Sequence, residues 1–200
     1  MVGEPTRWNH NLHYHRVVLD AVPEACERAL DVGCGEGTLT RQLRRVVPRV
    51  TGIDLDRASL DLPRAHPGAA DVDYILGDFL SYPFEAASFD PITSVASLHH
   101  MDAGAALERM RSLRRPGGVL VVVGLARGQY PADLLRDATA IVANRAQRTA
   151  RGYWDHPSPT TWPPPETFNG MRDLAARLLP GVIYRRHLLW RYSLVWTRQP

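Results

Sequence analysis

Apolar and polar stretches alternate along this chain of 200 residues in a pattern that predicts alternating strands and helices. Short runs rich in Val, Ile and Leu predict the strands, and the segments around them have helix-compatible composition. This alternation favours an α/β fold whose sheet is mostly parallel and covered by helices on both faces. The predicted strands lie near residues 28–32, 49–53, 72–76, 89–95 and 118–124, and the predicted helices near 12–21, 37–46, 57–65, 103–114 and 131–148.

Proline and aromatic residues refine this pattern in three segments. Residues 182–197 are rich in β-branched and aromatic side chains and contain no Gly or Pro, so they predict two further strands, about seven in all. Pro91 lies inside the fourth predicted strand, where it removes a ladder donor, and we expect the paired region to begin after it. The segment Pro116-Gly117-Gly118 predicts a turn before the fifth strand.

The most informative stretch is Ala29-Leu-Asp-Val-Gly-Cys-Gly-Glu-Gly37, in which a strand meets a turn with alternate glycines and then a helix-compatible segment. Glycine adopts positive φ readily and lets a ligand approach the backbone, while a helix start adds free N–H groups. The spacing differs from the dinucleotide pattern Gly-x-Gly-x-x-Gly, and the Gly-Lys-Ser/Thr of a P-loop is absent. A carboxylate in this turn, Asp31, would repel a phosphate but suits a cationic ligand.

Asp54 ends the second apolar segment, about 20 residues after the glycines, where an acidic residue can accept the two hydroxyls of a ribose. Taken alone, Asp31 could simply cap a turn and Asp54 could simply end a strand. Together with the three glycines, the two carboxylates indicate a nucleoside-like ligand that also carries positive charge.

With these residues the chain resembles the class I S-adenosylmethionine-dependent methyltransferases, of the small-molecule type that includes quinone-biosynthesis enzymes. The resemblance covers about residues 29–126. It implies a Rossmann-like open sheet, mostly parallel, of about seven strands with helices on both faces and a C-terminal antiparallel hairpin. The segments that carry it are Ala29–Gly37, Val50–Asp56, Gly77-Asp78-Phe79, and Ser88–Met101 followed by Leu113–Val123.

The resemblance implies S-adenosyl-L-methionine as the cofactor and S-adenosyl-L-homocysteine as its product. In open α/β sheets ligands bind beyond the carboxyl ends of the strands, and here Asp54 would bind the ribose and Asp78 the adenine amine. The sulfonium makes the methyl group electrophilic, so the protein mainly has to align an acceptor with the S–CH₃ bond. The residues expected to bind the cofactor are Asp31, Gly33, Gly35, Gly37, Asp54, Leu55, Asp78, Phe79 and Ser94.

We expect one domain, residues 1–200, in four parts. Residues 1–28 would form an N-terminal helical lid and residues 29–126 the cofactor-binding core. Residues 127–168 would form an insertion helix and a loop rich in proline and aromatics, and residues 169–200 the last helix and the β-hairpin. The family roofs its site with the first and third parts. The expected substrate or lid residues are Trp8, His10, His13, Tyr14, Tyr153, Trp154 and Trp162.

The histidines leave alternatives open. His99 and His100 follow the fourth predicted strand, near the expected point of methyl transfer, so either could be a catalytic general base. The pair could instead cap the next helix and pack the cofactor pocket, which is the interpretation that we favour. His10, His13 and His15 could bind a metal ion, but no Cys or spaced carboxylate completes a ligand set, so we expect no metal.

Composition indicates a compact cytoplasmic enzyme. We find no apolar stretch long enough to span a membrane and no signal-peptide core, and two cysteines, Cys26 and Cys34, imply no disulfide framework. All 24 basic residues are arginine, but a net charge of +3 with dispersed arginines does not indicate nucleic-acid binding. We expect a monomer or homodimer that acts on a small molecule, with no nucleic-acid or membrane partner.

The predicted activity is S-adenosylmethionine-dependent methylation of a small-molecule acceptor by in-line displacement, with O- or C-methylation favoured over N-methylation. An alternative is a methyltransferase-fold protein that binds the cofactor without catalysis and acts through a partner. An NAD-dependent oxidoreductase is less favoured, because its sheet would be all-parallel. The aromatic residues of the lid favour a flat or apolar acceptor.

Overall fold

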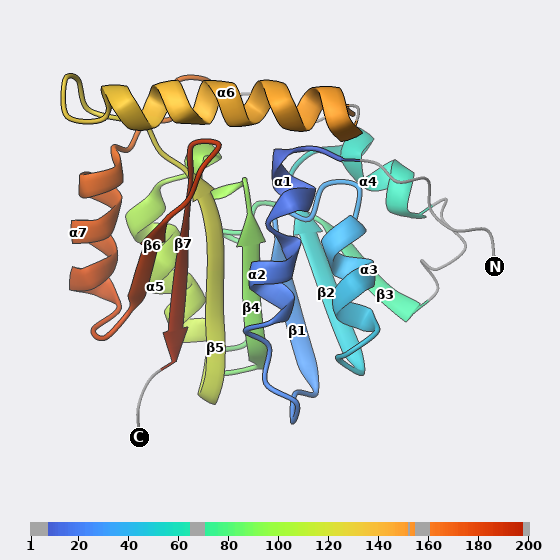
Figure 1. The fold of residues 1–200 in the computed structure, drawn as a ribbon. Helices are drawn as coiled ribbons and strands as arrows, with labels where there is room; N and C mark the ends of the chain where they lie inside the picture. The colour runs from blue at the N-terminus through green and yellow to red at the C-terminus, as the bar shows by residue number, and fades with distance from the viewer. Residues whose placement is uncertain (1–7, 65–70, 152, 155–160, 198–200) are drawn as a thin grey trace.

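The computed structural model of this chain describes residues 8–64, 71–151, 153–154 and 161–197. These residues form an open sheet of seven strands in the order β3-β2-β1-β4-β5-β7-β6 (Figure 1). The strands are β1 (Arg28–Val32), β2 (Arg49–Asp54), β3 (Val72–Leu76), β4 (Phe89–Val95), β5 (Arg114–Leu125), β6 (Ile183–Arg186) and β7 (Arg191–Thr197).

The strand pairing confirms the Rossmann-like α/β architecture. Strands β3, β2, β1, β4 and β5 are parallel, so their carboxyl ends meet at one edge of the sheet. Strand β7 is antiparallel to β5, and β6 is antiparallel to β7, which is the expected C-terminal hairpin. The strand order reverses between β1 and β4, and ligands of such sheets bind at this reversal.

Helices cover both faces of the sheet and its carboxyl edge (Figure 1). Helices α2 and α3 pack on one face and α5 and α7 on the other, while α6 crosses above the carboxyl edge. No helix in the described ranges is long and apolar enough to cross a membrane. The helices are α1 (His10–His13), α2 (His15–Leu19), α3 (Thr38–Arg44), α4 (Arg57–Arg64), the 3₁₀ helix η2 (Leu98–His100), α5 (Ala103–Leu113), α6 (Leu134–Arg151) and α7 (Phe168–Leu178).

Strand β5 separates the two halves of the core. Val119, Val121 and Val123 pack with residues of α2 and α3, whereas Leu120 and Val122 pack with residues of α5 and α7. Successive side chains of a strand point to opposite faces, so a strand covered on both sides needs a continuous apolar run. This double coverage holds the centre of the sheet in place.

Two predicted helices differ from the structure more than the other three do. The helix expected over 12–21 is two short helices, because the Asn9 side chain accepts hydrogen bonds from the N–H groups of Asn11 and Leu12 and starts α1 early. Tyr14 then separates α1 from α2. The helix expected over 131–148 begins and ends three residues later. The early start of α1 places residues 9–12 at the carboxyl edge.

The prolines near β4 behave partly as expected. Pairing of β4 with β1 begins at Ile92, after Pro91, but on the other side Pro91 itself pairs with Val119 of β5. The segment Pro116-Gly117-Gly118 is part of β5, at a register shift that falls between Phe89 and Pro91. Extra residues in a bulge let a strand continue where a regular ladder would exclude proline, so the prediction that a turn precedes the fifth strand here is wrong: β5 begins at Arg114.

Gly124 of β5 sets the packing between β5 and the hairpin. It pairs with Tyr192, and a Cβ at this position would lie 2.2 Å from Tyr192 Oη and 2.3 Å from Cζ. We expect Gly124→Ala to lower the free energy of unfolding by about 1–3 kcal/mol through overpacking, measured by denaturant unfolding. In a Tyr192→Leu background the same change should cost less. Equal costs in the two backgrounds would contradict this explanation.

Candidate functional site

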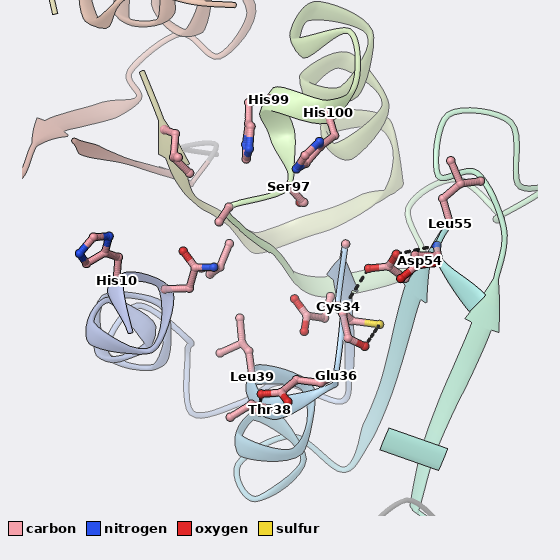
Figure 2. Close-up of a pocket in the computed structure, with 18 of the residues that line it drawn as sticks. His10, Cys34, Glu36, Thr38, Leu39, Asp54, Leu55, Ser97, His99 and His100 are labelled. Carbon is pink, nitrogen blue, oxygen red and sulfur yellow. Dashed lines mark hydrogen bonds between the residues drawn. The ribbon is translucent and has the colours of Figure 1, made fainter. Parts of the chain in front are cut away.

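A cavity of about 960 Å³ lies at the carboxyl edge of the sheet, at the reversal between β1 and β4. The turn after β1 and the ends of β2, β3 and β4 form one part of its wall. Helix α1, the 3₁₀ helix η2 and the turn between β6 and β7 form the other part, and the labelled side chains of Figure 2 point inward from several of these elements. Each residue of the predicted site can therefore be described by whether it lines this cavity.

The turn after β1 contains glycines, so its backbone lies at the cavity without covering side chains. Gly33, Gly35 and Gly37 have φ angles of 69°, 51° and 71°, which lie in the left-handed region that glycine tolerates. A Cβ at Gly33 would lie 2.2 Å from the Cβ of Ser97, so the turn also packs tightly against the end of β4. Gly33 and Gly35 line the cavity, whereas Gly37 caps the start of α3 and does not.

Asp54 at the end of β2 holds this turn in place. Its Oδ2 accepts a hydrogen bond from the N–H of Gly35 at 2.8 Å, and its Oδ1 accepts one from the N–H of Asp56 at 2.9 Å (Figure 2). Each carboxylate oxygen keeps a further lone pair, so the positioned carboxylate can still accept two ribose hydroxyls. The two motifs found in the sequence are thus directly bonded to each other.

Asp31 lies beneath the turn and is only 2% exposed, yet it lines the cavity. Thr40 Oγ1 donates to its Oδ2 at 2.7 Å, and Thr93 Oγ1 donates to its Oδ1 at 3.0 Å. Burial raises the pKa of Asp31 to about 6 although both hydroxyls favour the charged form. A positively charged ligand group nearby would lower this pKa again, so the site suits an ammonium or sulfonium group.

The expected adenine end has an acidic side chain beside apolar surface. Leu55 lies on the cavity wall with 74% of its surface exposed, and Phe79 lies buried on the same wall, so both offer apolar contact to a flat ring. The Oδ1 of Asp78 accepts the N–H of Leu80 at 2.9 Å, and its Oδ2 accepts the hydroxyl of Ser81 at 3.1 Å. The exposed Asp78 lines the cavity with lone pairs to spare.

Ser94 lies behind the cavity wall, and Ser97 takes its place on the wall. The Ser94 hydroxyl is fully buried and lies 2.5 Å from that of Ser97, which donates to the Val32 carbonyl at 2.8 Å. Ala96 has a φ of 54°, so the chain turns sharply after β4 and directs Ser97 toward the ligand space. The sequence did not indicate Ser97, because the turn before it contains no glycine and so cannot be recognised from residue types.

The 3₁₀ helix η2 brings both candidate histidines to the cavity (Figure 2). Their ring centroids are 4.0 Å apart. The Nδ1 atom of His99 is buried without a hydrogen-bond partner in the described residues, whereas that of His100 lies 3.0 Å from Thr161 Oγ1. Burial, with the charges of His100 and Arg191, lowers the pKa of His99 to about 4, and burial also lowers the pKa of His100. His99 is therefore neutral and a weak base.

The roof of the cavity joins segments that are far apart in the chain. The Trp8 ring meets that of Tyr153 edge to face at a centroid distance of 6.1 Å, and the N–H of Trp154 donates to the Trp8 carbonyl at 3.0 Å. His10 Nε2 lies 2.8 Å from Asn144 Oδ1 on α6, the helix above the sheet in Figure 1. The N-terminal segment and the segment after β5 thus contact one another above the site.

The expected lid residues fall into two groups. His10, Tyr153 and Trp162 line the cavity directly. The others lie outside its wall: Trp8 and Tyr14 are buried in the roof, Trp154 is half-buried and His13 is exposed. Of this second group, Tyr14 and Trp8 support the wall, since the Tyr14 hydroxyl donates to the Leu188 carbonyl at 2.7 Å and Trp8 packs on Tyr153.

Trp190 and Arg191 line the cavity although sequence reasoning did not single them out. They lie at the turn between β6 and β7, where Leu189 and Trp190 have φ angles of 58° and 56°. Trp190 Nε1 donates to Asp137 Oδ1 of α6 at 3.2 Å, which ties this turn to the roof. The feature of the sequence that could have indicated Arg191 is that it is a charged residue inside an apolar and aromatic strand.

The N-terminal histidines make hydrogen bonds within the roof and its support. His15 is buried with Nδ1 2.9 Å from Gln42 Oε1, and burial lowers its pKa to about 4. His13 Nδ1 accepts from Trp8 Nε1 at 3.4 Å. Among the residues that the structure describes, no group of three or more His, Cys, Asp or Glu side chains is arranged to hold a metal ion.

We expect Asp54→Ala to weaken binding of S-adenosyl-L-homocysteine by about 1–3 kcal/mol, because both ribose hydroxyls and the Gly35 N–H lose their acceptor. Isothermal titration calorimetry measures this directly. Asp73→Ala, which removes an exposed carboxylate from β3, is the matched control and should leave the affinity unchanged. Unchanged affinity in Asp54→Ala would remove this residue from the ribose site.

Comparison with known sequences gives the same family as the motifs. Residues 30–122 match a family model described as a methyltransferase domain. The chain is 35% identical to an uncharacterized methyltransferase of Mycobacterium tuberculosis (strain H37Rv) over 94% of this chain and 96% of that protein. It is 40% identical to the ubiquinone biosynthesis O-methyltransferase of Nitrosococcus oceani over 47% of this chain and 42% of that protein.

Comparison with solved structures shows the fold. The geranyl diphosphate C-methyltransferase from Streptomyces coelicolor, solved with S-adenosyl-L-homocysteine, has a TM-score of 0.66 at 12% identity, covering 94% of this chain and 79% of that one. The cradle of Gly33, Gly35 and Asp54 fits the nucleoside of this cofactor, and the buried Asp31 suits its positive charge. The chain belongs to the class I S-adenosylmethionine-dependent methyltransferases, with S-adenosylmethionine as its cofactor.

Proposed function

We propose that this enzyme methylates an oxygen or carbon atom, rather than a nitrogen atom, of a small-molecule acceptor. The single observation that carries the small-molecule acceptor is the roofed cavity, which has the glycine turn and carboxylates at one end and η2 with Tyr153, Trp162 and Trp190 at the other. Its volume of about 960 Å³ lies at the upper end for small-molecule pockets, which suits a cofactor together with a compact acceptor.

The cavity wall can align the methyl acceptor with the cofactor. When bound, S-adenosylmethionine supplies a methyl group on a sulfonium that an acceptor atom can take by in-line displacement. Asp54 and the Gly35 backbone fix the cofactor end, while Tyr153, Trp162 and Trp190 offer flat apolar faces to an acceptor. Holding two reactants in line lowers the barrier by up to ~7–11 kcal/mol, so alignment accounts for a large part of the catalysis.

The roof covers part of the cavity and limits the access of water to it. Its contacts, which join Trp8 to Tyr153, His10 to Asn144 and Trp190 to Asp137, tie α1, α6 and the β6–β7 turn together above the sheet. A closed site keeps an acceptor from exchanging with water and strengthens the electrostatic interactions inside it. A macromolecular acceptor would have to displace these contacts, so the roof supports a small molecule.

An oxygen acceptor has further support from the relative in Nitrosococcus oceani, which is named as an O-methyltransferase. His99 and His100 would shape the acceptor end and not remove a proton. The low pKa of His99 makes it a weak proton acceptor, while its ring lies on the cavity wall and can pack against an acceptor. Its contribution would therefore be orientation.

The direct test is incubation of the purified protein with S-adenosylmethionine and a panel of phenols, quinols, amines and carboxylic acids, with products identified by mass spectrometry and NMR. We expect one added methyl group on oxygen or carbon. Gly35→Val, which strains a left-handed turn residue and fills ligand space, should abolish the reaction. Methylation of amines alone would contradict the proposal, and cofactor binding without turnover on any acceptor would indicate a non-catalytic binding protein.

We expect His99→Gln to lower kcat by less than about 10-fold, because the ring orients the acceptor but does not remove its proton; a general base would cost ~10²–10⁴. Single-turnover kinetics isolate this step. Since the pKa of His99 is about 4, parent turnover should show no titration of this ring near neutral pH and should fall only as the pH approaches 4. His100→Gln is measured in the same way, and a 10²-fold loss in either variant would make that histidine a catalytic base.

A further inference from the structure

Arg191 is a buried cation in the cavity wall. Its residue surface is 6% exposed, and its side chain lines the cavity from the first position of β7. Its Nη1 donates to the Leu189 carbonyl at 3.1 Å, and its Nη2 donates to Asn11 Oδ1 at 2.8 Å. Its Nε is buried without a hydrogen-bond partner. Both partners are neutral, so the guanidinium keeps its full charge and an unused donor.

No salt bridge joins Arg191 to a carboxylate within the part of the chain that the structure describes. Burial lowers the pKa of Arg191 to about 10, so the group remains charged at neutral pH, and the nearby groups that oppose this shift are the phenols of Tyr14 and Tyr153. Buried charges in proteins are ordinarily paired. An unpaired guanidinium that faces a ligand cavity therefore indicates that the ligand supplies the negative charge.

The charges of the cavity wall are separated by sign. Its five carboxylates lie at or beside the ends of β1, β2 and β3, at the cofactor end, and they are Asp31, Glu36, Asp54, Asp56 and Asp78. Arg191 pairs with Leu125 at the end of β5, and β7 lies three strand spacings, ~14 Å, from β1. This separation places Arg191 at the acceptor end.

Neutral side chains surround Arg191 on the acceptor side. Burial lowers the pKa values of His10 and His99, and the charge of Arg191 acts in the same direction on both. These rings therefore stay neutral at neutral pH and do not compete with Arg191 for an anion. Arg191 is the sole arginine or lysine on the described cavity wall, so one anionic group on the acceptor matches it.

The turn that carries Arg191 is strained. Leu189 and Trp190 both have positive φ angles, which cost energy for residues with branched or bulky side chains. The buried Leu189 and the hydrogen bond from Trp190 to Asp137 hold this conformation. Strain of this kind persists where the surrounding structure enforces it, and here it places the guanidinium of the next residue on the cavity wall.

We propose that Arg191 binds a carboxylate of the methyl acceptor, so that the substrates of this enzyme are small carboxylic acids. A guanidinium matches a carboxylate in shape and can donate two parallel hydrogen bonds to it. Nη1 and Nη2 each carry a second N–H beyond those that bond to Leu189 and Asn11, and these two N–H groups can donate to the two carboxylate oxygens. This inference rests on the proposed function, because a carboxylate can belong to a methyl acceptor only if the protein transfers methyl groups. The binding of the carboxylate itself is measurable without turnover.

The first experiment uses the full-length protein saturated with S-adenosyl-L-homocysteine. Benzoate and octanoate are titrated by calorimetry beside their neutral amides, benzamide and octanamide. We expect each carboxylate to bind at least about 10-fold more tightly than its amide. Equal affinity within both pairs would overturn the proposal. This comparison needs no variant, so it stands even if a substitution at Arg191 impairs folding.

The second experiment compares two arginine variants of the same hairpin. Arg191→Met should remove the preference for the carboxylate, whereas Arg185→Met, which deletes an exposed charge outside the cavity, should keep it. Circular dichroism and a melting curve check the fold of each. We expect kcat/KM for a carboxylic acid acceptor to fall about 100-fold in Arg191→Met only. A preserved preference in Arg191→Met would overturn the proposal.

The cofactor has a carboxylate of its own, and a third measurement separates it from that of the acceptor. S-adenosyl-L-homocysteine carries the amino acid carboxylate, and 5′-methylthioadenosine lacks it. We expect Arg191→Met to leave both affinities nearly unchanged. A selective loss for S-adenosyl-L-homocysteine would overturn the proposal, since Arg191 would then hold the cofactor. Carboxylate binding that depends on Arg191, without methyl transfer to any acceptor, would support Arg191 as the carboxylate site and contradict the proposed function alone.

Discussion

The hydrogen bond from the Gly35 N–H to the Asp54 carboxylate is the constraint on which the site depends. It joins the turn after β1 to the end of β2, while the close approach of Gly33 to Ser97 joins the same turn to the end of β4. Glycine at both positions makes the left-handed backbone and the close contact accessible. Three strand ends are thereby fixed together, which gives the cofactor a preformed surface.

The electrostatics of the cavity follow from the order of the strands. Carboxylates lie near the ends of β1, β2 and β3, while Arg191 lies on β7, on the far side of β4 and β5. Burial keeps His99 neutral between these two regions. A cofactor with positive charge and an acceptor with negative charge would each meet the opposite sign, and the attraction between them would add to this arrangement.

The roof shows how segments outside the common sheet complete the site. Helix α6 lies above the carboxyl edge, and it meets the N-terminal segment through His10 and Asn144 and the last hairpin through Trp190 and Asp137. These are polar contacts between few side chains, and loosely packed elements open more easily than a core. The roof can therefore be the part that moves when ligands enter, while the doubly covered sheet stays fixed.

The sequence by itself determined the α/β class, the strand positions and the glycine turn with Asp31 and Asp54, because periodicity and turn chemistry are local properties. It did not determine that Ser97 would replace Ser94 on the wall, or that β5 would run through Pro116, because a sharp turn at Ala96 and a strand bulge have no local signature. Arg191 was hidden for a different reason. Its role depends on its burial beside Asn11, 180 residues away, and this contact forms only when β7 has paired with β5 and α1 lies at the carboxyl edge.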